Sequence, residues 1–181
     1  SSKIIYALTS SKFSNTHAKN LRKIFDTDAN EILYTIPPFQ RNYSWKKDNV
    51  SALWDDLLES HKNEDIDSST AQYLLGATVL IPEPEQNSSY NRIIDGQQRF
   101  ATLTLYFCAI RDLYLELTGK LPEDNELLKI IANYQTKDSR TEFVSWKLTL
   151  NDVDRELFEK LQDYQNKDTS FITYADKIKN V

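Results

Sequence analysis

The residues best suited to bind or react with a ligand form the string Asp95-Gly96-Gln97-Gln98-Arg99, between a strand-like apolar run and a long helical pattern. A helix start presents backbone N–H groups without helical acceptors and the positive end of the helix dipole. Gly96 lacks a Cβ and lets an anion approach the backbone, and Arg99 carries a fork of donors suited to phosphate oxygens. Asp95 could hold Mg²⁺ or accept from a ribose hydroxyl, while Gln97 and Gln98 supply neutral donors and acceptors. We therefore predict a phosphate-binding turn whose ligand is a nucleoside triphosphate.

A purely structural interpretation of this turn competes with the functional one. Asp-Gly is a common turn, and polar residues in a first helical turn are often only solvated. Two adjacent Gln residues before an Arg are unusual for capping alone, which favours the functional interpretation.

A second polar and aromatic string, Phe39-Gln40-Arg41-Asn42-Tyr43-Ser44-Trp45, follows Pro37-Pro38. Arg41 could reach a second phosphate, and Tyr43 or Trp45 could stack on a base or on an arginine. Alternatively, Arg41 pairs with a helix carboxylate and the aromatic residues pack in the core. For Tyr43 and Trp45 we favour packing, because aromatic side chains mostly fill cores.

Metal chemistry has weaker support elsewhere in the sequence. Asp55 and Glu59 lie on one face of a predicted helix and could share a metal ion, with Asp56 beside them. Such residues more often form the solvated side of an amphipathic helix. His17 and His61 are too few for a histidine-rich centre, and the single cysteine, Cys108, is expected to be a small buried hydrophobe.

Apolar periodicity predicts the elements that position these strings. Strands are expected over residues 31–36, 73–81 and 90–94, the last two as a hairpin, with a helix from about residue 48. The longest helix starts after Gly96 and ends near Gly119. Beyond it, Leu127 to Tyr134 suggest a helix, residues 146–150 a short strand, and Asn151 the cap of a last helix. We divide the chain into a ligand-binding domain (1–120) and the start of a helical region (121–181) that is expected to be truncated.

Composition excludes several classes of protein. A net charge of −5 over 181 residues argues against a general nucleic-acid coat, although a local basic patch stays open. No apolar run approaches the ~20 residues that cross a bilayer, and no signal peptide is evident. One cysteine fits a reducing compartment, so we expect a cytoplasmic protein without a membrane partner. Because no Met occurs, we expect a trimmed chain or the ordered part of a longer one.

Three segments together carry a family resemblance: IPPFQRNYSW (36–45), YLLGATVLIP (73–82) and YNRIIDGQQRFATL (90–103). They resemble the N-terminal domain of GmrSD-type restriction proteins, a family with a ParB- and sulfiredoxin-like fold. The resemblance covers residues 31–117 and extends with less similarity through WKLTLNDVDRELFEKL to residue 162. It implies an α+β fold, with a small mixed sheet flanked by helices and a mainly helical C-terminal part.

The resemblance also implies a function. It points to an NTP-binding and NTP-hydrolysing regulatory domain of a prokaryotic restriction or anti-phage defence protein that acts against foreign, often modified, DNA. The domain would be a Mg²⁺-dependent nucleoside triphosphatase controlling an HNH-type nuclease on the same or a partner chain. No HNH constellation is visible here, so nuclease activity is not expected from this chain alone.

The family's functional residues transfer by position. Asp95, Gln97, Gln98 and Arg99 would be catalytic, with Gln97 or Gln98 orienting the attacking water and Asp95 the candidate metal ligand. The nucleotide-binding positions would be Gln40, Arg41, Tyr43, Trp45, Gly96 and Thr102. One departure is Ala101, where the family usually has Thr; the missing hydroxyl makes efficient turnover less certain.

Three alternatives stay open. The chain could be a DNA-binding module that uses Arg41, Lys46, Lys47 and Arg99 without hydrolysing nucleotide. It could be a ParB-like nuclease that depends on Asp95, or a structural regulator with a degenerate loop. The preferred base, the DNA modification sensed and homo-oligomerisation are not fixed by the sequence.

Overall fold

The computed structural model describes residues 6–11, 14–20, 24–25, 32–62, 74–82, 90–121, 126–138 and 140–164. These residues form an α+β fold with a mixed six-stranded sheet, a separate two-stranded hairpin and four helices. The α+β class predicted from the sequence is confirmed. Among these residues, no helix is both long enough and apolar enough to cross a membrane.

The sheet combines parallel and antiparallel pairs. Its strands, in spatial order, are β2 (Ser14–Asn20), β1 (Tyr6–Ser11), β4 (Leu74–Pro82), β5 (Tyr90–Asp95), β3 (Leu33–Thr35) and β8 (Leu148–Thr149). β4 and β5 form the predicted antiparallel hairpin, whereas β3 lies parallel to both β5 and β8. Because β3 and β5 run the same way, the chain segments that follow both strands leave from the same end of the sheet.

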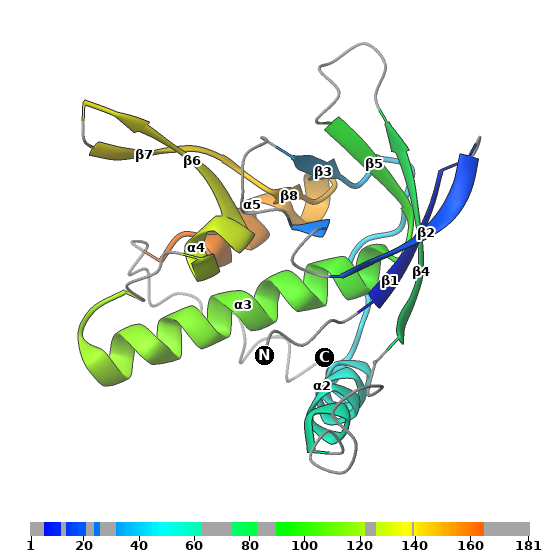
Figure 1. Cartoon of the computed structure of the whole chain (residues 1–181), viewed down its shortest axis with the longest axis horizontal. Helices are drawn as coiled ribbons and strands as arrows, with labels where there is room; N and C mark the ends of the chain where they lie inside the picture. Colours follow the sequence, from blue (N-terminus) through cyan, green and yellow to red (C-terminus); the bar gives the residue numbers. More distant parts are fainter. Residues whose placement is uncertain are drawn as a thin grey trace.

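Four helices accompany the sheet: α2 (Lys47–Lys62), α3 (Gln97–Thr118), α4 (Glu126–Ile131) and α5 (Asp152–Gln162). Figure 1 shows α3 as the longest element, running from the end of the sheet towards the far side of the molecule, with α2 near its first half. α3 ends at Gly119, whose backbone is left-handed (φ 71°) and whose N–H donates to Leu115 O at 2.9 Å. The sequence predicted this glycine stop correctly.

An aromatic cluster joins α3 to the sheet. Phe25, Tyr34 and Phe100 are buried, and the ring of Phe100 lies 5.5 Å from that of Phe25 and 5.3 Å from that of Tyr34. Apolar residues of the strands, including Ile93 and Leu148, complete the core. The first turns of α3 are therefore fixed against the sheet, whereas Leu117, near the end of the helix, is 75% exposed.

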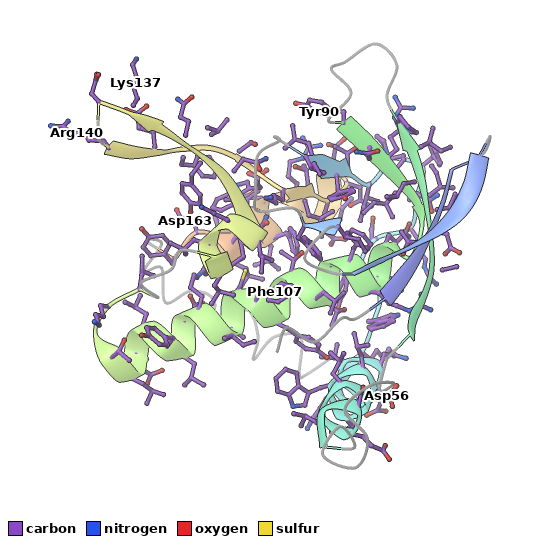
Figure 2. All side chains as sticks on the ribbon, viewed as in Figure 1. Asp56, Tyr90, Phe107, Lys137, Arg140 and Asp163 are labelled. Atoms are coloured by element: carbon purple, nitrogen blue, oxygen red, sulfur yellow. The ribbon has the colours of Figure 1, made fainter. Side chains whose placement is uncertain are left out.

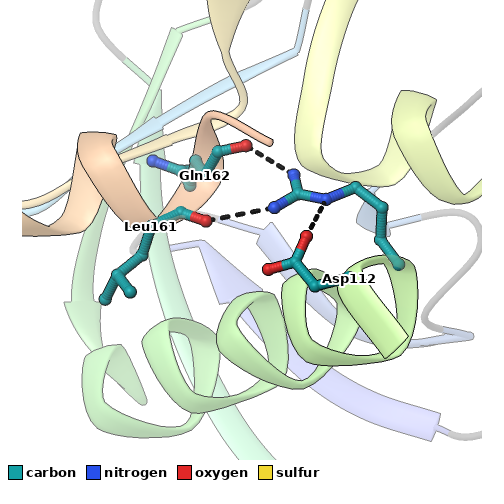
Figure 3. Close-up of polar contacts among 4 residues, drawn as sticks. Asp112, Leu161 and Gln162 are labelled. Carbon is teal, nitrogen blue, oxygen red and sulfur yellow. Dashed lines mark hydrogen bonds and ion pairs between the residues drawn. The ribbon is translucent and has the colours of Figure 1, made fainter. Parts of the chain in front are cut away.

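α3 is also tied to α5 through Arg111, a buried arginine (1% exposed). Its guanidinium donates to Gln162 O at 2.5 Å and to Leu161 O at 3.2 Å, the carbonyls at the end of α5, and to the Asp112 carboxylate at 2.8 Å (Figure 3). A cation at a helix C-terminus satisfies carbonyls that lack helical donors. This contact fixes the orientation of α5.

Several elements differ from the sequence prediction. The N-terminal strands β1 and β2 were not predicted. The helix expected through Tyr134 ends at Ile131, and Tyr134 lies in β6 (Ala132–Lys137), which pairs with β7 (Arg140–Trp146). Figure 2 shows Lys137 and Arg140 at the tip of this hairpin, which projects away from the sheet. The part after residue 120 thus contains strands as well as helices, and β8 extends the main sheet.

Candidate functional site

The turn between β5 and α3 depends on Gly96. Its backbone is left-handed (φ 87°), a conformation that L side chains rarely adopt, and it occupies the cap position of α3. A Cβ at this position would lie 2.7 Å from Thr78 Oγ1 on β4. Asp95 Oδ1 accepts from Gly96 N at 2.8 Å, but no side chain from the described residues caps the next amides of the helix. The start of α3 therefore retains N–H groups for another partner.

Gln98 has a structural role that uses its whole amide. Its Oε1 accepts from Ser44 N at 2.8 Å and from Trp45 N at 3.3 Å, and its Nε2 donates to Asn42 O at 3.1 Å. The segment after β3 is thereby pinned to the first turn of α3. Since both ends of the amide are engaged, Gln98 has no free acceptor for a water molecule.

Gln97 is different, because half of its amide has no partner. The side chain is buried (6% exposed), and its Nε2 makes one long hydrogen bond, 3.4 Å, to Arg41 O. Its Oε1 is buried and accepts no hydrogen bond in the described part of the chain. A buried acceptor without a donor costs free energy, roughly 1–3 kcal/mol. Gln97 is therefore the residue of this turn that is prepared to accept from a ligand.

A shallow hollow, partly open to solvent and with an enclosed space of about 10 Å³, lies beside this first turn. Its lining residues are Ile36, Arg41, Tyr43, Gln97, Gln98, Ala101, Leu150, Asn151 and Asp154. They come from the segment after β3, the start of α3 and the start of α5. Ala101 is part of the wall, so the position at which the resemblance implied a threonine lies in the hollow itself.

Arg41 supplies the positive charge of the hollow. Its side chain is exposed, and its guanidinium has no hydrogen-bond or ion-pair partner among the residues that the structure describes. The alternative prediction, that Arg41 pairs with a helix carboxylate, is therefore wrong for the described residues. A free guanidinium at the mouth of a hollow can bind an anion without breaking an existing contact.

Arg99 lies on a different side of the turn and does not line the hollow. Its Nη1 donates to Ala77 O on β4 at 3.4 Å, and the guanidinium packs against Gly76. A Cβ on Gly76, whose φ is 97°, would lie 2.8 Å from Nη1. The glycine of the YLLGATVLIP segment is therefore explained by the close approach of Arg99 to β4.

The other predicted nucleotide-binding residues hold the segment in place. Gln40 Nε2 donates to Ile94 O at 3.1 Å, and Trp45 packs against the core. The Tyr43 and Thr102 hydroxyls share a hydrogen bond of 2.8 Å, and Thr102 also donates to Gln98 O at 2.8 Å. Burial raises the pKa of Tyr43, although the hydrogen bond to Thr102 opposes this shift. Tyr43 and Trp45 both pack against the core, as the sequence favoured, and Tyr43 also lines the hollow; their assignment to nucleotide binding stays a prediction.

α5 contributes two residues that the sequence analysis did not assign to the site. Asn151 caps α5, as predicted, accepting from Asp154 N at 3.4 Å, and its Nδ2 donates to Asn42 Oδ1 at 2.8 Å. Asp154 Oδ2 accepts from Tyr43 N at 2.6 Å. The spacing Asn151-x-x-Asp154 is an ordinary helix-start signal, so only the fold reveals that this start faces the Arg41 segment.

The remaining candidates contribute little to a metal centre. In the described part of the chain, no group of three His, Cys, Asp or Glu side chains could hold a metal ion. Asp55 and Asp56 are exposed on α2, and Figure 2 shows Asp56 on the outer side of that helix. His17 and His61 have side chains outside the described residues. Cys108 is buried, and burial raises the pKa of its thiol to about 12, as expected for an inert core cysteine.

The model of the GmrSD restriction endonuclease N-terminal domain matches residues 21–180. The chain belongs to this family. A search of curated proteins found no match. The GmrSD_N match spans the Arg41 segment, the α3 turn and the start of α5, so every lining residue of the hollow lies within the family domain. The chain is thus part of a restriction-system protein, and the resemblance noted in its sequence is confirmed.

Proposed function

We propose that this GmrSD-type domain binds and hydrolyses a nucleoside triphosphate and thereby regulates a nuclease domain outside this chain. The observation that carries the proposal is that Arg41, with its free guanidinium, and Gln97, with its unpaired buried Oε1, line one hollow at the start of α3. Arg41 is suited to anionic oxygens, and the Gln97 acceptor is suited to a water molecule or a hydroxyl.

The size of the hollow limits which part of the nucleotide enters it. Its enclosed space of about 10 Å³ holds roughly one water molecule, far less than the roughly 300–1,000 Å³ of pockets that enclose drug-sized ligands. The terminal phosphate would therefore bind at the mouth of the hollow, to Arg41 and to the first amides of α3, with room inside for one water molecule, and the nucleoside would remain outside. Arg99 would contact the triphosphate only after leaving Gly76.

Mg²⁺ fits this arrangement only as an ion shared with the ligand. Asp95, with Oδ1 held by Gly96 N and its other oxygen available, would be the protein ligand, and phosphate oxygens would supply others. Bound there, the ion would neutralise charge on the phosphates. The protein's own contribution is positioning: Gln98 fixes the Arg41 segment, and Gln97 offers an acceptor to the attacking water.

The connections of this segment support a regulatory role. Residues 41–45 contact α3 through Gln97 and Gln98 and α5 through Asp154. A terminal phosphate bound by Arg41 would move or stiffen the segment and shift both helices, and its release would reverse the change. Through this coupling, the nucleotide state would control a nuclease domain of the complete restriction protein and so its action on DNA.

The test is phosphate release by the purified chain with Mg²⁺ and each of the four NTPs, together with titrations of a non-hydrolysable analogue. Arg41→Ala is expected to weaken binding at least tenfold, whereas the control Lys47→Ala, which removes an exposed charge on α2, is expected to leave it unchanged. Arg99→Ala tests whether that guanidinium also reaches the ligand. If no NTP binds at millimolar concentration, or if both control and test variants bind equally, the proposal is wrong.

A further inference from the structure

Asp154 occupies a position in the hollow that the proposed function does not yet use. It lies in the first turn of α5, and its Oδ2 accepts from Tyr43 N at 2.6 Å. Oδ1 accepts no hydrogen bond from the residues that the structure describes, and the side chain is half-buried. One carboxylate oxygen is thus anchored and the other is free.

Two residues that line the same hollow therefore carry an acceptor without a partner in the described part of the chain: Gln97 at Oε1 and Asp154 at Oδ1. Acceptors attract donors, and the smallest donor with two hydrogens is water, which commonly bridges buried polar groups of this kind. Arg41, in the same wall, is suited to hold an anion next to that water. The three side chains come from three different segments, and the hydrogen bonds of Gln98 and Tyr43 keep those segments together.

We infer that Asp154 is a catalytic residue of the proposed triphosphatase, holding the attacking water together with Gln97 and accepting its proton. The inference rests on the proposed function. In the step, the water oxygen forms a bond to the γ-phosphorus while the bond to the β–γ bridging oxygen breaks. That bridging oxygen keeps the electron pair, and one water proton passes to Asp154 and then to solvent. The products are a nucleoside diphosphate and inorganic phosphate.

Access to Gln97 Oε1 requires only a small rearrangement. The atom is sealed from solvent, but the amide is held by a single 3.4 Å hydrogen bond to Arg41 O. Because this bond is long, rotation of the amide breaks little. A phosphate that draws Arg41 outward would break the same bond, so binding of the anion would itself release the acceptor that orients the water.

The experiment compares Asp154→Asn with Asp152→Asn in steady-state NTP hydrolysis. Asn at 154 retains an acceptor for Tyr43 N but cannot take a proton; Asp152 is exposed on the same helical turn and provides a control with the same change of charge. Asp154→Asn is expected to lower kcat at least about a hundredfold, the usual range for loss of a general base, with KM changed less than threefold. Asp152→Asn is expected to retain the wild-type kcat, and thermal unfolding of both variants verifies folding.

The outcomes distinguish the role of Asp154 from the proposed triphosphatase activity. If the wild type hydrolyses NTP and Asp154→Asn does so at the same rate, the role of Asp154 is wrong and the triphosphatase stands. If raising Mg²⁺ restores the kcat of Asp154→Asn, Asp154 is a metal ligand and the inference is also wrong. If the wild type hydrolyses no NTP, both fall together. If Gln97→Ala lowers kcat as much as Asp154→Asn does, and the variant with both changes loses no more than either alone, the result supports one water molecule held by both residues.

Discussion

The turn at Gly96 offers the most quantitative test of how the sequence builds this site. Gly96→Ala places a Cβ at φ 87°, where a left-handed backbone costs about 1–2 kcal/mol, and sets it 2.7 Å from the buried Thr78 Oγ1. Overpacking of this kind adds about 1–3 kcal/mol. We therefore expect a total loss of about 2–5 kcal/mol in the free energy of unfolding.

Gly119→Ala is the matched control for this change. Its φ of 71° is also left-handed, but a Cβ there meets no atom within 4 Å, so only the backbone cost of about 1–2 kcal/mol applies. The assay is urea unfolding followed by circular dichroism, supported by Tm, which falls about 2–4 °C per kcal/mol in a chain of this size. Adding Thr78→Ala should return part of the extra loss in Gly96→Ala. If Gly96→Ala costs no more than Gly119→Ala, the close contact between the turn and β4 is refuted.

Further predictions concern the residues around this turn. Gln98→Ala is expected to lower the free energy of unfolding in urea by about 2–3 kcal/mol, because three hydrogen bonds to the 42–45 segment are lost. Gln97→Ala removes one long hydrogen bond and an unpaired acceptor and should cost less than about 1 kcal/mol. Equal costs would contradict the assignment of Gln98 as the residue that holds this segment. Arg111→Met is expected to cost about 2–4 kcal/mol in the same assay, because it leaves the last carbonyls of α5 unpaired. The control Arg155→Met breaks an exposed ion pair with Asp152 and should cost less than about 0.5 kcal/mol. Cys108, with its pKa raised by burial to about 12, should carry a thiolate fraction of only about one in ten thousand at pH 8 and react with a thiol reagent only after unfolding; rapid modification of the folded protein would contradict its burial. Because the folded-state pKa of Cys108 lies above its ordinary value of 9.0, the contribution of this thiol to stability is complete below pH 9.0 and is lost as the pH rises towards about 12.

The sequence was informative where local signals decide the structure. The strand-like run over residues 90–94, the glycine that ends it and the helical period to Gly119 predicted β5, the turn and α3. Asn151 was identified as a cap for the same reason, since capping depends on neighbours three residues away. In contrast, Tyr134 fits a helical period with Leu127 and Ile131, and only its pairing with Phe143 in β7 places it in a strand.

Tertiary contacts account for what the sequence could not predict about the site. Two adjacent glutamines look equivalent in the sequence, yet the segment after β3 uses the whole amide of Gln98 and leaves half of that of Gln97 unpaired. Arg99 lies in the Asp-Gly-Gln-Gln-Arg string but packs over Gly76, whereas Arg41 lines the hollow. Asp154 is more than a hundred residues from Tyr43 along the chain, so no local pattern could connect them.

The most direct measurement follows the backbone amides of the uniformly labelled chain by NMR during titration with Mg²⁺ and a non-hydrolysable NTP, and then with the matching NDP. A terminal phosphate bound at the start of α3 is expected to shift the amides of Gln97, Gln98 and Arg41 most strongly, and the NDP should shift them much less. If the NTP moves amides elsewhere and leaves these three unchanged, the phosphate does not bind here and the account fails.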